Sequence, residues 1–294
     1  MSHASGGYYL PEPSKWPIIG SIGIFLTLFG FASALPHGEG EVGNLTVMYV
    51  GMAVIIFMMF GWFGQVIRES ESGTYDAQVD RSFRMGMLWF IFSEVMFFAA
   101  FFGALFYARQ YSLPWLGGAD NNAMTNAVLW PDFTPDWPLS TMPSTEGFSA
   151  YKEVIGAWGI PALNTAILLT SGITVTFAHW ALKKGNRGGL IFWLFATVVL
   201  GFTFVGFQAY EYGHAYSDLN LTLNSGIYGS TFYMLTGFHG LHVTIGAIML
   251  AVMLFRSMKG HFTAENHFGF EAAAWYWHFV DVVWLGLFIF VYWL

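Results

Sequence analysis

The sequence predicts an all-α, polytopic membrane protein with seven transmembrane helices. Of its 294 residues, 55% are hydrophobic and 10% are charged, whereas soluble domains carry about 25% charged residues. A transmembrane helix needs about 20 mainly apolar residues, and seven stretches of the chain meet that length. The sequence has no cysteine, which excludes disulfides, thiolate metal ligands and iron–sulfur clusters. We expect residues 1–294 to form a single transmembrane domain.

The first three predicted spans follow a proline-rich start that contains Pro11, Pro13 and Pro17. The second of them is apolar up to Arg68, and the third is apolar except for Glu94 and a basic residue near its end. Their expected ranges are about 16–35, 45–67 and 85–111.

A long polar segment, 112–153, separates the third span from the last four. It holds five prolines, so we expect a loop, and its Trp115, Trp130 and Trp137 suit the membrane–water interface. The remaining spans are expected at about 154–182, 190–212, 229–255 and 272–294.

Loop charges predict the orientation of the chain. Nine of the 11 Lys and Arg residues flank one side of the predicted spans, and basic loops stay in the cytoplasm. These nine are Lys15, Arg68, Arg81, Arg84, Lys183, Lys184, Arg187, Arg256 and Lys259. We therefore expect a cytoplasmic N-terminus and a periplasmic C-terminus in a bacterial-type inner membrane, with the mitochondrial inner membrane as the weaker choice. The net charge of −7 does not suggest a nucleic-acid partner.

Glu94 is the single formal charge in the apolar run 93–106 of the third span. A carboxylate in hydrocarbon is costly, so Glu94 should face other helices and be protonated or hold a partner. At about 1.5 Å per residue it lies about 13 Å from the cytoplasmic end of its span. His239 and Asp281 lie at comparable depth, so these groups are expected to meet near the midplane.

Histidine–carboxylate spacing leaves a metal site as one interpretation. His239 and His242, and likewise His278 and Asp281, are three residues apart, so each pair shares a helix face. The pair Glu211 and His214 has the Glu-x-x-His spacing of di-iron helical bundles, but a second such motif is missing.

Three other interpretations stay open from the residues alone. A haem could be held between His239 and His278. The polar groups could instead be interhelical hydrogen bonds, worth about 0.6 kcal/mol each. They could also serve an independent proton or solute transporter. Arg68 and Arg256 either anchor their helices or bind anionic lipid headgroups.

Several long motifs closely resemble subunit III of the haem–copper cytochrome c oxidases. The motifs are Leu-Pro-Glu-Pro-Ser-Lys-Trp-Pro at 10–17, Val-Ile-Arg-Glu-Ser at 66–70, Ser-Glu-Val-Met-Phe-Phe at 93–98, Gly-Ile-Tyr-Gly-Ser-Thr-Phe at 226–232, Gly-Phe-His-Gly-Leu-His-Val at 237–243, His-Phe-Gly-Phe-Glu at 267–271 and Trp-Tyr-Trp-His-Phe-Val-Asp-Val-Val-Trp at 275–284. The likeness covers almost the whole chain.

The resemblance implies seven helices arranged as two plus five around a cleft that holds phospholipids. It implies no catalytic centre and no haem, copper or other cofactor in this chain, with haem and copper in the partner subunits. It implies direct packing on subunit I, contact with subunit II and small subunits, and cytochrome c as a partner through the complex. The implied role is to protect the proton-pumping core from turnover inactivation and to support proton uptake.

The resemblance also assigns site residues. Glu94 matches the buried carboxylate of the family that reacts with a hydrophobic carbodiimide, and His239, His242, His278 and Asp281 are expected around it. Lipid headgroups are expected at four further residues, Arg68, Trp62, Glu69 and Arg256. Two departures stand out: segment 112–153 is longer than in mitochondrial relatives, and the family's second histidine after His179 is Trp180 here.

Overall fold

A computed structural model describes residues 12–35, 43–143 and 147–294, and every regular element in these ranges is helical. Seven of the helices are long and apolar enough to cross a membrane, as the sequence predicted. The chain divides into two compact units, residues 1–83 and residues 84–294. The boundary falls within helix α3, Ala77–Tyr107.

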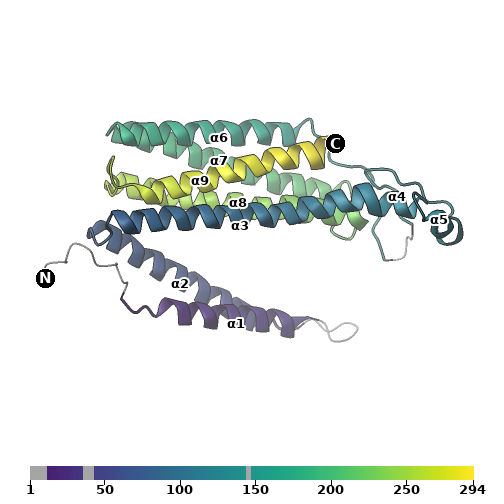
Figure 1. The fold of residues 1–294 in the computed structure, drawn as a ribbon, viewed down its shortest axis with the longest axis horizontal. Helices are drawn as coiled ribbons and strands as arrows, with labels where there is room; N and C mark the ends of the chain where they lie inside the picture. Colours follow the sequence, from purple (N-terminus) through teal and green to yellow (C-terminus); the bar gives the residue numbers. More distant parts are fainter. Residues whose placement is uncertain (1–11, 36–42, 144–146) are drawn as a thin grey trace. The chain divides into compact units, whose positions relative to one another are not determined.

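The first unit is a helical hairpin of α1, Trp16–Ala34, and α2, Thr46–Glu71 (Figure 1). The two backbones approach closely at Gly30, where a Cβ atom would overlap the backbone of Met48. The indole N–H of Trp16 donates to Gln65 Oε1 at 2.8 Å and ties the helices together. Most apolar side chains of both helices face outward, since at most 17% of either span is buried.

The second unit contains four long helices after α3. These are α6, Ile160–Lys183, α7, Arg187–Ser217, α8, Gly226–Lys259, and α9, Phe268–Leu287, which continues into the π-helical turn η2, Phe288–Trp293. Successive helices pack side by side and α9 returns to α6, so the four close into a bundle (Figure 1).

Helix α9 carries the core of this bundle. Trp277 and Trp284 are fully buried, and their indole N–H groups donate to Ser171 Oγ and Thr165 Oγ1 of α6, each at 2.9 Å. The Trp277 ring fills the space beside Gly246 of α8, where a Cβ atom would come within 2.9 Å of it. Buried tryptophan with a satisfied N–H supplies a large apolar contact without an unpaired donor.

Helix α3 joins the bundle through aromatic contacts from residue 84 onward. The ring of Phe97 lies 5.1 Å from that of Phe238 on α8, and the ring of Phe98 lies 6.1 Å from that of Phe279 on α9. Phe98 is almost completely buried. These rings place Glu94, one turn earlier on α3, against α8.

Several helix boundaries differ from the predicted spans because glycine, proline or an aspartate cap sets where the helix begins or ends. Helix α6 begins at Ile160 and not near 154, because Gly159 adopts φ 126° and Pro161 favours the first turn. Asp76 Oδ1 accepts the N–H groups of Gln78 and Val79, so α3 begins well before the apolar run at 85. Helix α8 extends to Lys259 and ends at the left-handed Gly260.

The segment 112–153 is a loop in part, but it also holds two short helices, α4, Leu113–Leu116, and α5, Ala123–Leu129. Three buried residues, Leu113, Phe133 and Leu139, form a small core of its own. The Tyr151 hydroxyl donates to the Leu139 carbonyl at 2.6 Å, and burial raises the pKa of Tyr151 to about 12.

Candidate functional site

Glu94 pairs with His242 across the contact between α3 and α8. Glu94 Oε2 lies 2.8 Å from His242 Nε2, and the two side chains are 22% and 11% exposed. His242 Nδ1 lies 2.6 Å from the Phe238 carbonyl oxygen, which can only accept, so Nδ1 carries a hydrogen. A second hydrogen must then lie between His242 Nε2 and the Glu94 carboxyl. A neutral imidazole with its hydrogen on Nδ1 and an ionised carboxylate would have no hydrogen between them. The contact between His242 Nε2 and Glu94 Oε2 therefore contains one added proton, which the two groups share.

His239 lies one turn away on α8 but serves a different contact. Its Nε2–H donates to the Val280 carbonyl of α9 at 3.1 Å, and the ring is completely buried. Rings of Phe98, Phe204 and Trp284 surround it, with centroids at 6.4, 5.8 and 5.1 Å. This enclosed donor does not suit axial ligation of a haem, so the residues do not fit the haem interpretation.

His278 and Asp281 form a third, separate contact. His278 Nδ1 lies 3.6 Å from Asp281 Oδ2, and the side chains are 46% and 7% exposed. Asp281 lies against the backbone of α6, where a Cβ atom at Gly172 would overlap its carboxylate. Asp281 is thus placed between helices α9 and α6, whereas Glu94 is placed between α3 and α8. The predicted midplane cluster is three neighbouring polar contacts and not one site.

The two residues of the Glu-x-x-His motif on α7, Glu211 and His214, also contact different groups. Glu211 is buried, and its Oε1 accepts from Tyr292 at 2.7 Å and from Gln208 at 3.1 Å. His214 instead lies 2.6 Å from Asp218 at the exposed end of the helix. Glu211 and His214 therefore contact different partners and do not face one common point where a metal ion could bind both.

The residues predicted to bind lipid differ in their surroundings. Arg68 and Trp62 are exposed on α2, and Trp62 stacks on Phe63. Glu69 accepts from Gln65 and from Tyr75, each at 2.7 Å. In the second unit, the Arg256 guanidinium lies 4.5 Å above the Phe262 ring and is half-buried. Arg68 therefore presents its charge outward, while Arg256 is engaged within its own unit.

A histidine–carboxylate cluster that the sequence did not predict lies where α6 meets the start of α9. His179 is in the last turns of α6, and His267 and Glu271 are four residues apart at the start of α9. The i, i+4 spacing of His267 and Glu271 was the available signal, since it places both side chains on one helix face. Their approach to His179 could not be read from the chain.

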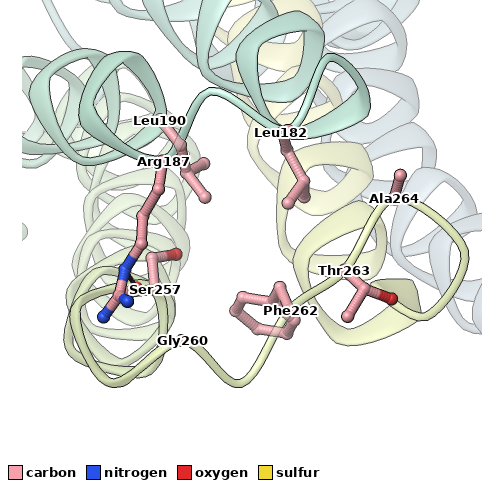
Figure 2. Close-up of a pocket in the computed structure, with 9 residues that line it drawn as sticks. Leu182, Arg187, Leu190, Ser257, Gly260, Phe262, Thr263 and Ala264 are labelled. Carbon is pink, nitrogen blue, oxygen red and sulfur yellow. Dashed lines mark hydrogen bonds between the residues drawn. The ribbon is translucent and has the colours of Figure 1, made fainter.

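A small pocket opens at the same end of the bundle (Figure 2). Arg187, at the start of α7, crosses it and donates to the carbonyls of Ser257 and Met258. These are carbonyls of the last turn of α8, where a cation is favourable. Thr263 lines the pocket, and its carbonyl accepts from His267.

The fold and these contacts define a multi-pass α-helical membrane protein with ionisable side chains held between its helices. A protein-family model described as cytochrome c oxidase subunit III matches residues 6–121 and 126–294. Proteins named cytochrome c oxidase subunit 3 from Tetraodon nigroviridis and Gadus morhua are each 40% identical, and that from Latimeria chalumnae is 41% identical. Each comparison covers 100% of this chain and 99% of the relative.

The chain belongs to the cytochrome c oxidase subunit III family. It is therefore part of an oxidase complex of the respiratory chain, as the motif resemblance predicted.

Proposed function

We propose that this chain is a non-redox accessory subunit of a proton-pumping cytochrome c oxidase. It packs directly on subunit I, contacts subunit II and small subunits, and meets cytochrome c through the complex. Haem and copper belong to the partner subunits. This assignment is supported because the sequence has no cysteine and because His239 and His242 contact backbone carbonyls of the chain itself.

The apolar surface is the observation that carries the proposal. Unusually many large apolar side chains face outward on the first unit; Phe60 is 78% exposed and Phe57 61%. Such a surface needs lipid or a neighbouring membrane subunit to cover it. The chain serves as one transmembrane domain that binds phospholipid. Arg68, Trp62, Glu69 and Arg256 bind the headgroups.

The Glu94–His242 pair anchors α3 to α8 and stores one proton within the subunit. In this role it stabilises the core during turnover and supports proton uptake on the cytoplasmic side. His239 and the His278–Asp281 pair hold the neighbouring helices in register. The chain itself performs no step of oxygen reduction.

The basic loops support an N-terminus on the side from which protons are taken up. A bacterial-type inner membrane remains a prediction for this chain. The vertebrate origin of the relatives above weighs against it and favours the mitochondrial inner membrane.

Lipid and subunit analysis of the native complex by mass spectrometry tests the proposal. We expect the chain to be recovered with a haem–copper core and with tightly bound phospholipid. Recovery of haem or copper on this chain alone would contradict it. Proton or solute transport by the chain alone in liposomes would favour the transporter alternative instead.

A further inference from the structure

The cluster of His179, His267 and Glu271 has no part in the function proposed above. It lies at the basic end of the bundle, where α6 ends and α9 begins. His179 Nε2 lies 3.3 Å from His267 Nε2, and each lies 3.5 Å from Glu271 Oε1. Three potential ligand atoms thus form a nearly equilateral triangle.

This triangle has the size of one face of a zinc coordination tetrahedron. Zinc binds His nitrogen and carboxylate oxygen at about 2.0–2.2 Å, and the edges of such a tetrahedron are about 3.3–3.6 Å. The three measured separations lie within that interval. An ion above the triangle would have all three ligands in place without movement of a helix.

The hydrogen bonding of His267 prepares it as a ligand. Its Nδ1 lies 3.0 Å from the Thr263 carbonyl oxygen, so Nδ1 carries the hydrogen and Nε2 presents a lone pair to the cluster. An imidazole whose second nitrogen donates to a carbonyl is the usual arrangement of a metal-bound histidine. Glu271 Oε1 lies at the same distance from both histidine nitrogens, so a carboxylate oxygen and the lone pair of His267 meet at one point.

The positive charge of Arg84 affects how strongly the cluster can attract a cation. Arg84 of α3 forms an ion pair with Glu271 through Oε2 and also lies over the Phe268 ring at 5.4 Å. The pairing leaves Oε1 toward the histidines and fixes the carboxylate. The same positive charge opposes a second cation nearby, so Arg84 weakens the attraction of the cluster for an ion.

Solvent reaches the cluster from one side. The side chain of His179 is 24% exposed, whereas those of Glu271 and His267 are 13% and 7% exposed. Thr263, whose carbonyl contacts His267, lines the pocket of Figure 2. An aqueous ion can therefore approach past His179 and keep water as a further ligand.

We propose that His179, His267 and Glu271 form a binding site for a zinc-class divalent ion at the basic end of the subunit. Two imidazoles and one carboxylate favour zinc over the hard cations calcium and magnesium, which prefer oxygen ligands. The ion links α6 to α9, and Arg84 sets its affinity.

The test uses the whole purified oxidase complex, stripped with a chelator and equilibrated with buffered free zinc. Bound zinc per complex is measured for wild type and for His267→Asn and Glu271→Gln. We expect each variant to lose one zinc and to need at least about 100-fold more free zinc to regain it. His214→Asn, which removes a histidine beside a carboxylate at the opposite end, should bind as wild type does.

Arg84→Gln should change the zinc affinity in the opposite direction from the two ligand substitutions. Removing one positive charge near a divalent ion should tighten zinc binding by about tenfold. Equal zinc binding by wild type and His267→Asn in fully assembled complexes would overturn the proposal. If the ligand variants fail to assemble, anomalous scattering at the zinc edge of the wild-type complex decides. A peak between α6 and α9 supports the site, and its absence at saturating zinc refutes it.

Discussion

Replacing Glu94 by glutamine should leave the subunit almost as stable as wild type. The glutamine amide can donate to His242 Nε2, which lies 2.8 Å from the present carboxyl oxygen. The interhelical hydrogen bond is kept without the shared proton. Since such bonds contribute about 0.6 kcal/mol on average and about 1.7 at most, the change should stay within about 0.6 kcal/mol.

Alanine at the same position should cost more. It removes the bond and leaves the buried His242 Nε2 without its partner, which costs about 1–3 kcal/mol. Ser93→Ala is the matched control, because Ser93 is the neighbouring residue on α3 and its exposed hydroxyl donates to the Phe90 carbonyl of its own helix. We expect the order of stability to be wild type, Ser93→Ala and Glu94→Gln together, then Glu94→Ala.

The assay is the retention of this subunit in the detergent-solubilised complex during a thermal ramp, followed by oxygen consumption. Glu94→Gln should keep the initial rate of oxygen reduction, because the redox centres belong to the partner subunits in our proposal. Equal losses for Glu94→Gln and Glu94→Ala would contradict the retained hydrogen bond, and no oxygen reduction in a fully assembled Glu94→Gln complex would contradict a non-redox role.

Three further predictions address lipid, packing and the loop 112–153. Arg68→Ala should lower the phospholipid retained by the purified complex, and Arg68→Lys should keep it, because the exposed charge acts on the headgroup; equal lipid content by mass spectrometry would count against this role. Gly246→Ala should destabilise the bundle by about 1–3 kcal/mol, since its Cβ would come within 2.9 Å of the Trp277 ring. Gly240→Ala is the control, because a Cβ atom at this position of the same helix meets no other atom within 4 Å. Equal thermal stability of the two variants would exclude the close contact. The pKa of Tyr151 is raised from 10.0 to about 12, so the stabilisation by its neutral hydroxyl is complete below pH 10 and is lost as the pH rises through 12. Protease cleavage in 112–153 should therefore rise between pH 10 and pH 12. Tyr151→Phe should abolish this pH dependence.

The sequence predicted the number of spans and their order because each apolar run is long and bounded by charge or proline. It did not predict where the helices end. Apolar counting stops at the last hydrophobic residue, but the backbone continues until a cap or a special dihedral intervenes, as at Gly260 with φ 79°. Short helices within 112–153 were missed because four to seven residues are too few for a periodic signal.

Depth in the membrane indicated which polar residues are neighbours, but not which ones touch. Glu94, His239 and Asp281 are predicted at comparable depth, yet each contacts a different group, because helix rotation decides which side chains meet. The His179 cluster was missed for the same reason: the sequence shows the pair on α9, while its third member comes from α6. Pairing across helices is a property of packing, which local sequence patterns do not record.

The accessory role of this subunit is tested by comparing the purified oxidase with and without it. Oxygen reduction is followed from the first turnovers until activity decays, with haem and copper measured in both preparations. We predict that the core without this chain keeps its haem and copper and starts at a comparable rate, but inactivates after fewer turnovers. Loss of haem, copper or initial activity together with the chain would contradict an accessory, non-redox role.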